Sequence, residues 1–328
     1  MIYYMCALAA EAKPIIEFYG LKRVNRPGRF QFFEHAGDRR RNVQESCRNA
    51  EAVLVISGTG SYNAAVAVTL LCSAYPPESR DIFINFGICG AMPESGLCIG
   101  DVCAVCGVYS DAGDRPLYPD MIIESGFRKC KIKTCAAPVS FFDLEGSYGC
   151  DNDGPELVDM ESYGALFAAM SFFECHRCFV IKTVSDIVGE STVNPDGFEK
   201  YAFDKELAAA AARKGAADVV EFASKAEREI YELSPADIIP DAEDIKAAER
   251  LGEILLLSYS QKEQLRCILR RRTLEGRRSA KAIFDFIQEY CGDESQPIAL
   301  SEDGARRMSR REGKHLFEAF KKYEEYYD

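Results

Sequence analysis

The fold of this chain is indicated by one stretch at residues 157–190, which reads LVDMESYGALFAAMSFFECHRCFVIKTVSDIVGE. It places Asp159 and Glu161 before a helix rich in Ala and Phe, and Asp186 at the end of an apolar strand. The helix is apolar enough to pack against a sheet. In open α/β sheets, ligands bind outside the carboxyl ends of the strands. We therefore expect these acids at one shared site, although each alone also suits a helix cap or a loop.

Small residues follow other predicted strands of the chain. Residues 2–8 read as a buried strand, and Glu11 follows where the chain turns into a helix. Residues 52–57 form a second apolar strand, which GTGS at 58–61 turns into another helix. A strand at 81–86 ends in GICG at 87–90. Glycine lets the backbone approach a ligand closely, so these strand ends are candidates for a binding site.

Taken together, these motifs resemble the nucleoside phosphorylase and nucleosidase superfamily, and most of all the methylthioadenosine/S-adenosylhomocysteine nucleosidases. The resemblance rests on VDME with the strand ending in VSD, and on three stretches in matching order: CALAAEAKPII at 6–16, SGTGSYNAA at 57–65, and INFGICGAM with GLCIGDVCAV at 84–105. It covers about two thirds of the chain and implies an α/β fold with a central mixed sheet flanked by helices.

The resemblance also implies roles for individual residues. Asp186 would be the general acid toward N7 of a purine, with Ser185 helping to position it, and Glu11 would be the general base that activates water. Glu161 would bind the ribose hydroxyls, and Met160 would pack against the sugar. The remaining expected binding residues are Thr59, Gly60, Ile88, Cys89, Gly90, Phe141 and Phe142. The two adjacent Phe residues also suit a hydrophobic core.

The family contains hydrolases and phosphorylases, and the negative charge of Glu11 favours a hydrolase. A phosphorylase holds phosphate with arginines and backbone N–H groups, whereas Glu11 would repel it. We expect hydrolysis of a purine nucleoside that releases the free base. Phosphorolysis, another 5′ substituent as in futalosine-like nucleosides, and a non-catalytic nucleoside sensor remain alternatives.

Four positions depart from the family pattern. Ile88 and Cys89 replace the Ser-Ala of the usual Gly-Ser-Ala-Gly, which removes a hydroxyl that could help hold water. Asp159 stands in place of a Glu, and Lys182 stands where the nucleosidases usually carry an Arg. These changes bear on the substrate and the rate more than on the reaction class.

Composition points to an intracellular protein. The fourteen cysteines sit largely in apolar runs, as small hydrophobes in a reducing cytoplasm do. The start of the chain does not read as a signal peptide, and no apolar run approaches the ~20 residues of a membrane span. The pairs Cys103/Cys106 and Cys175/Cys178 invite a zinc interpretation, but the first lies in a predicted strand that would point the two thiols to opposite faces. We expect no metal and no cofactor.

Two domains are expected: a nucleosidase-like α/β domain at residues 1–233 and a small all-α domain of unknown role at 241–328, after a linker with Pro235 and Pro240. In the second domain, an arginine cluster recurs near helical spacing at Arg266, Arg270, Arg277 and Lys281, and it could meet RNA, DNA or an acidic protein. A net charge of −12 and interspersed acids favour a solvated helix face instead. The family resemblance implies a homodimer.

Overall fold

The structure is a computed structural model of the whole chain. It describes residues 1–35, 51–112, 116–119, 123, 125–138, 154–189, 192–193, 199–200, 205–232, 298–299 and 307–308. The chain divides into two compact units, Met1–Tyr231 and Glu232–Asp328. Beyond residue 232 the described part is one antiparallel pair, β12 (Ile298–Ala299) with β13 (Arg307–Met308). The expected C-terminal helices and the arginine cluster lie outside the described residues.

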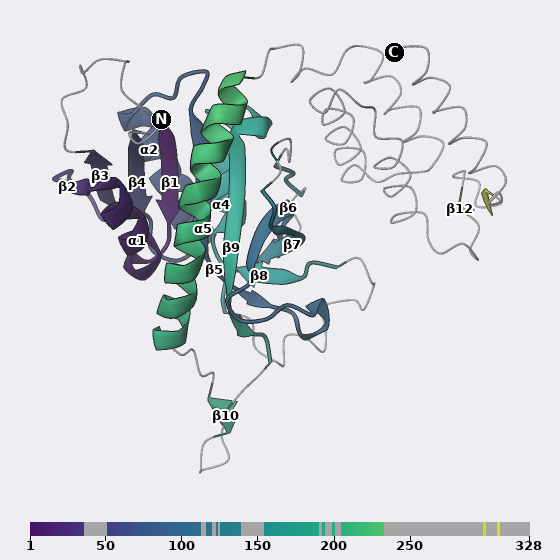
Figure 1. Cartoon of the computed structure of the whole chain (residues 1–328). Helices are drawn as coiled ribbons and strands as arrows, with labels where there is room; N and C mark the ends of the chain where they lie inside the picture. The colour runs from purple at the N-terminus through teal and green to yellow at the C-terminus, as the bar shows by residue number, and fades with distance from the viewer. Residues whose placement is uncertain are drawn as a thin grey trace. The chain divides into compact units, whose positions relative to one another are not determined.

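The first unit is built on a nine-stranded mixed sheet with strand order β2-β3-β4-β1-β5-β8-β7-β6-β9 (Figure 1). Its strands are β1 (Ile2–Cys6), β2 (Leu21–Val24), β3 (Gln31–His35), β4 (Ala52–Ile56), β5 (Ile82–Ala91), β6 (Val102–Ser110), β7 (Arg128–Thr134), β8 (Leu157–Asp159) and β9 (Cys178–Ile187). A separate pair joins β10 (Thr192–Val193) to β11 (Glu199–Lys200). This confirms the expected α/β fold with a central mixed sheet.

One half of the sheet closes on itself. Strand β9 pairs with β6 in antiparallel fashion and with β5 in parallel fashion, so the strands β5-β8-β7-β6-β9 form a ring. Closure removes the exposed edges that an open sheet would have. It also brings the short strand β8 and the end of β9 next to the same strand, β5.

Helices cover both faces of the sheet. They are α1 (Ala9–Tyr19), α2 (Ser61–Ala74), α4 (Ser162–Ala169) and α5 (Lys205–Glu232), with single 3₁₀ turns at Pro93–Ser95 and Cys175–Arg177. The alternation of β1 separates the two layers. The hydroxyl of Tyr3 donates to the carbonyl of Tyr75 after α2, whereas the hydroxyl of Tyr4 meets that of Tyr19 at the end of α1. Every residue of β1 is buried, as expected for a strand covered on both faces.

The long helix α5 packs along β9, in front of the sheet in Figure 1. Phe222 of α5 contacts Phe127 and Phe179, with ring centroids 5.9 and 5.1 Å away. Closer to the start of the helix, a Cβ on Gly215 would lie only 1.9 Å from Oγ1 of Thr183 on β9. The glycine therefore lets the helix approach the strand closely at this point. In the described part of the chain, no helix is long and apolar enough to cross a membrane.

One strand differs from its expected extent. The strand expected at 81–86 continues as β5 through Gly87, Ile88, Cys89 and Gly90 to Ala91. The reason is pairing: this segment stays in register with residues 182–187 of β9, with one irregularity between Cys89 and Gly90. The glycines do not end the strand, and they leave room beside it for other side chains.

Candidate active site

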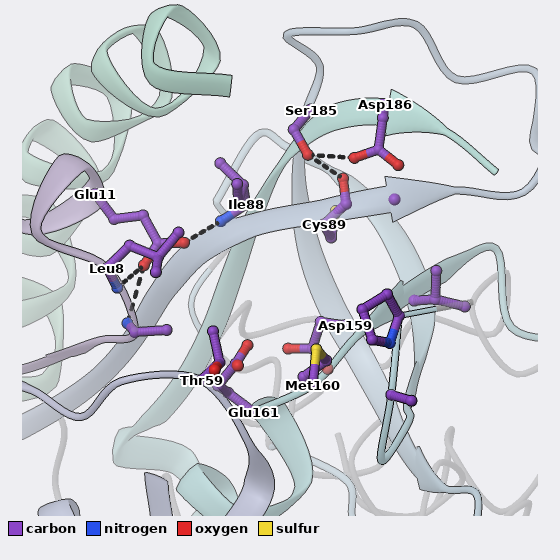
Figure 2. Close-up of a pocket in the computed structure, with 15 residues that line it drawn as sticks. Leu8, Glu11, Thr59, Ile88, Cys89, Asp159, Met160, Glu161, Ser185 and Asp186 are labelled. Atoms are coloured by element: carbon purple, nitrogen blue, oxygen red, sulfur yellow. Dashed lines mark hydrogen bonds between the residues drawn. The ribbon is translucent and has the colours of Figure 1, made fainter. Parts of the chain in front are cut away.

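A cavity of about 390 Å³ lies where the carboxyl ends of several strands meet the starts of α1, α2 and α4 (Figure 2). It is lined by Ala7, Leu8, Glu11, Thr59, Ile88, Cys89, Gly90, Ala137, Pro138, Val158, Asp159, Met160, Glu161, Ser185 and Asp186. Four of these side chains are carboxylic acids. Figure 2 shows Glu11 at one side of the cavity and Asp186 at another, with Ile88 and Cys89 of β5 between them.

Glu11 is buried in the first turn of α1, and three main-chain N–H groups hold its carboxylate. Its Oε2 accepts hydrogen bonds from the N–H groups of Ala7 (2.9 Å) and Leu8 (2.8 Å), and its Oε1 accepts one from Ile88 (3.0 Å). Burial raises the pKa of Glu11, and these hydrogen bonds together with the nearby charge of Lys182 oppose that rise. Because a carboxylate offers about four acceptor sites, the group keeps capacity for one more donor.

Glu161 stands at the N-terminal end of α4 and reaches across to α2. Its Oε1 accepts a hydrogen bond of 2.8 Å from the N–H of Gly60. Burial and the neighbouring carboxylate of Asp159 raise the pKa of Glu161 to about 7, against opposition from Lys182. This acid therefore titrates near neutral pH, where a small change in its surroundings alters its charge.

Asp159 and Lys182 form a buried ion pair behind Glu161. Nζ of Lys182 lies 2.9 Å from Oδ2 of Asp159, and both side chains are 1% exposed. Burial disfavours the charged form of Lys182, but the carboxylates of Asp159, Glu161 and Glu11 outweigh it and raise its pKa. A Cβ on Gly87 would lie 3.0 Å from Oε1 of Glu11 and 3.4 Å from Nζ of Lys182. Glycine at this position therefore lets both charged groups approach β5.

Ser185 and Asp186 end β9 on the other side of the cavity. Oγ of Ser185 lies 2.6 Å from Oδ1 of Asp186 and 3.1 Å from the carbonyl oxygen of Cys89. A Cβ on Gly90 would come within 3.2 Å of Oδ2 of Asp186. The end of β5 thus provides both a hydrogen-bond partner for Ser185 and space for the carboxyl group of Asp186.

Most residues expected at the site lie around this one cavity. Those that line it are Glu11, Thr59, Ile88, Cys89, Gly90, Asp159, Met160, Glu161, Ser185 and Asp186. Gly60 does not line the cavity but binds Glu161 through its N–H. Phe141 and Phe142 lie outside the described residues.

Five lining residues were not among those expected: Ala7, Leu8, Ala137, Pro138 and Val158. Ala7 and Leu8 directly follow β1, Ala137 and Pro138 follow β7, and Val158 belongs to β8. The rule that ligands bind at the carboxyl ends of strands applies to all three strands. Applied beyond the acids and glycines, it would have found them.

The paired cysteines gather no metal-like ligand set in the described part of the chain. Cys103 and Cys106 both lie on β6, where the first is buried and the second half-buried, as expected for residues on opposite faces. Cys175 begins a 3₁₀ turn and Cys178 begins β9. Among the described residues, no group of three or more His, Cys, Asp or Glu side chains is arranged to hold a metal ion.

Comparison with known proteins identifies the family. The sequence model of the phosphorylase superfamily matches residues 2–139. A 5′-methylthioadenosine/S-adenosylhomocysteine nucleosidase from Marinomonas sp. (strain MWYL1) is 30% identical over 177 residues, which cover 46% of this chain and 74% of that protein. The chain belongs to the phosphorylase superfamily. The family inferred from the sequence motifs is therefore confirmed.

Two solved structures share the fold of the first unit. A nucleosidase of the same name from Neisseria meningitidis, in complex with methylthio-immucillin-A, is 21% identical with a TM-score of 0.54. The match covers 68% of this chain and 98% of that one. A futalosine hydrolase from Helicobacter pylori strain 26695 is 16% identical with a TM-score of 0.53, over 68% of this chain and 97% of that one. At these identities the likeness shows a shared fold.

Proposed function

We propose that the chain hydrolyses the N-glycosidic bond of a purine nucleoside of the methylthioadenosine or S-adenosylhomocysteine type and releases the free base. The observation that carries this proposal is the convergence of Glu11, Glu161 and Asp186 on one cavity, from three distant parts of the chain. The relatives named as nucleosidases support the substrate class. Breaking the bond needs a proton for the leaving base, stabilisation of a ribosyl cation and a nucleophile on the opposite face.

Asp186 is the general acid in this proposal. A serine hydroxyl carries one proton, yet Oγ of Ser185 is within hydrogen-bond distance of two acceptors, Oδ1 of Asp186 and the Cys89 carbonyl. The shorter contact, 2.6 Å, is the hydrogen bond that Ser185 donates to Oδ1 of Asp186, and it orients the carboxyl group in the cavity. This arrangement suits an acid that delivers a proton to N7 of the purine and so makes the base a better leaving group.

Glu161 binds the sugar. With one oxygen engaged by Gly60, the carboxylate has acceptor capacity left for the ribose 2′- and 3′-hydroxyls. Its negative charge favours the positive charge that develops on the sugar ring. Met160, next to it in the cavity lining, offers a polarizable apolar surface for the same ring.

Glu11 is the general base that takes a proton from the attacking water. Three N–H groups fix the carboxylate, so its remaining acceptor site has a defined direction. The raised pKa brings the group closer to the operating pH, which is where general bases are most effective.

Water is favoured over phosphate as the nucleophile. A phosphate dianion needs cationic partners, and none of the described residues that line the cavity is a Lys or Arg. Lys182 forms an ion pair with Asp159, and its positive charge is balanced by the carboxylates of the protein itself. Glu11, with its negative charge at the nucleophile position, would repel phosphate.

This function is tested by measuring, with chromatography, the release of free base from methylthioadenosine, S-adenosylhomocysteine, adenosine and inosine. Glu11→Gln removes the proposed base, and Glu17→Gln is its matched control because Glu17 is exposed on the same helix. We expect adenine release by the wild type and the control, and a loss of at least about 10²-fold in Glu11→Gln. Nucleoside binding without base release in the wild type would support a sensor instead.

We also infer that the chain forms a homodimer through exposed apolar side chains on two neighbouring helices. Tyr62, Val66 and Leu70 recur every fourth residue on α2 and are 91%, 47% and 46% exposed. On α4, Phe167 is 59% exposed and stacks on Tyr163 with ring centroids 6.4 Å apart. We call these five residues the α2–α4 apolar face.

A second copy of the chain is the occupant that suits this face. A C₂ dimer uses the same patch on both subunits, and contiguous exposed apolar patches mark such interfaces. The two helices approach closely, since a Cβ on Gly164 would lie 1.9 Å from the carbonyl oxygen of Ser61. The hydrogen bond from Gly60 to Glu161 lies beside this crossing. Dimerisation there would therefore support the sugar-binding side of the cavity.

Residues 1–233 are proposed as the catalytic domain and residues 241–328 as a separate domain. All residues that line the cavity belong to the first compact unit. The helical nature of the second domain rests on its sequence pattern. We infer a cytoplasmic location from cysteines such as Cys103 and Cys130, which are buried in the core as thiols.

A further inference from the structure

Two departures of the sequence from its family, Asp159 and Lys182, contact each other in the structure. Lys182 lies on β9 and Asp159 at the end of β8, and strand β5 pairs with both of these strands. The contact of 2.9 Å between Nζ and Oδ2 is fully buried. Loss of either residue would leave the other as an uncompensated buried charge, which is destabilising.

Hydrogen bonds from three donors besides Lys182 fix the carboxylate of Asp159. Its Oδ1 accepts from Oγ1 of Thr134 at 2.8 Å, and its Oδ2 accepts from the N–H (3.0 Å) and the Oγ (2.6 Å) of Ser162. Oγ1 of Thr134 in turn accepts a hydrogen bond of 2.9 Å from the N–H of Tyr163. Strand β7 and the first turn of α4 therefore fix the position of Asp159, and Asp159 fixes that of the lysine ammonium.

The charge of the ammonium acts on the two carboxylates that the proposed reaction uses. The raised pKa of Lys182 reflects the charges of Asp159, Glu161 and Glu11. Gly87 leaves room for its Nζ near Oε1 of Glu11. Among the described residues, its other titratable neighbours are the buried thiols of Cys6 and Cys89. This part of the site thus holds three carboxylates and one ammonium.

We propose that Asp159 and Lys182 are a positioning pair: Asp159, clamped by Thr134 and Ser162, holds the ammonium of Lys182 where it favours the ionised forms of Glu11 and Glu161. This inference rests on the proposed hydrolysis and adds residues that do not touch the substrate to its machinery. The two members act on Glu161 in opposite directions. Lys182 favours its ionised form, and Asp159 opposes it.

The opposite effects define the test. Carboxyl ¹³C resonances of glutamate-labelled protein are titrated in wild type, Asp159→Asn and Lys182→Met, with Glu161→Gln assigning the Glu161 signal. We expect the Glu161 titration to move to lower pH in Asp159→Asn and to higher pH in Lys182→Met, each by about one unit or more. The acidic limb of the pH profile of kcat/KM should follow, so that Lys182→Met loses activity at pH 7 and regains part of it at higher pH.

Controls separate positioning from a merely structural role. Lys214→Met removes a lysine whose Nζ donates to the carbonyl of Gly100, outside the cavity lining. This variant should leave the Glu161 titration and the pH profile of kcat/KM unchanged. If Lys182→Met does not fold, the double variant Asp159→Asn/Lys182→Met removes both buried charges and should fold. Its Glu161 titration should lie between those expected for the two single variants.

Equal losses of activity in both single variants, with an unmoved Glu161 titration, would overturn the positioning pair while leaving the hydrolase intact. Failure of the proposed function gives a different result. The wild type would then release no base, yet the opposite shifts of the Glu161 signal would still be observed if the pair acts as proposed.

Discussion

The N–H of Gly60 donates a hydrogen bond of 2.8 Å to Oε1 of Glu161, and this bond joins the N-terminal ends of α2 and α4 beside the cavity. Glu161 precedes α4 but makes no side-chain capping bond to its own helix. Its carboxylate is directed to the neighbouring helix instead. The position therefore holds an acid at the cavity wall, where a residue that only capped α4 would turn back on its own backbone.

The titration of Glu161 predicts a pH-dependent stability. Its pKa of about 7 in the folded state lies above the ordinary value of 4.5, so the stability that it contributes is fully present below about pH 4.5 and is lost as pH rises through 7. Glu161→Gln removes this dependence. Relative to wild type, the variant should gain on the order of 2–3 kcal/mol in free energy of unfolding between pH 4.5 and pH 8. Chemical denaturation across this range measures it.

Glu11 has a raised pKa as well and contributes in the same direction, so the wild type keeps part of the slope after Glu161 is replaced. The raised pKa of Lys182 acts only at alkaline pH. A difference between wild type and Glu161→Gln that stayed constant across the range would show that Glu161 does not titrate there.

Replacement of Asp186 by Asn should abolish the acid step. The amide keeps the shape of the side chain but has no acidic proton to deliver, so we expect kcat to fall by about 10²–10⁴-fold with nucleoside binding largely retained. Single-turnover kinetics and calorimetric binding separate the two effects. Asp218→Asn on α5, outside the residues that line the cavity, is the matched control. Full activity of Asp186→Asn would place the acid elsewhere.

If the chain dimerises through the α2–α4 apolar face, formation of the dimer should depend on Phe167. Phe167→Ser should shift the chain from dimer to monomer, because it removes a large exposed aromatic side chain from the face. Phe18→Ser is the matched control, since Phe18 is 66% exposed on α1. Sedimentation equilibrium measures the mass of each variant. A wild-type monomer, or a dimer that survives Phe167→Ser, would contradict this interface.

Removal of the second domain should spare the chemistry. A chain that ends at residue 240 keeps every cavity residue and the whole of α5, whose Phe222 packs against the sheet. We expect kcat/KM within about twofold of the full chain, since the described residues that line the cavity all belong to the first unit, which has its own core. A truncated protein that folds, as circular dichroism would show, but releases no base would assign part of the site to the C-terminal domain.

The fold could be predicted from sequence because its signals are local. The strand at β1, the turn through Gly58 to Ser61 and the helix after Glu161 each follow from apolar periodicity and glycine placement. The length of β5 could not be predicted in this way. Its extension to Ala91 depends on pairing with β9, a segment about 95 residues further along the chain, and periodicity within β5 carries no information on that partner.

The site was predictable to the extent that its residues are acids, glycines or parts of motifs. Ala7, Leu8 and Pro138 line the cavity with no chemical signature, and only their place after strand ends reveals them. The contact between Asp159 and Lys182 likewise depends on the arrangement of β8 and β9 around β5. Two unusual residues in the sequence thus become one ion pair in three dimensions.

The measurement that tests the central claim most directly is the product analysis of methylthioadenosine turnover in phosphate-free buffer and in excess phosphate, by chromatography and mass spectrometry. Our account predicts adenine and the free thiosugar at the same rate in both buffers, because Glu11 activates water and no cationic side chain among the described cavity residues holds phosphate. Formation of a sugar 1-phosphate that requires added phosphate would contradict it.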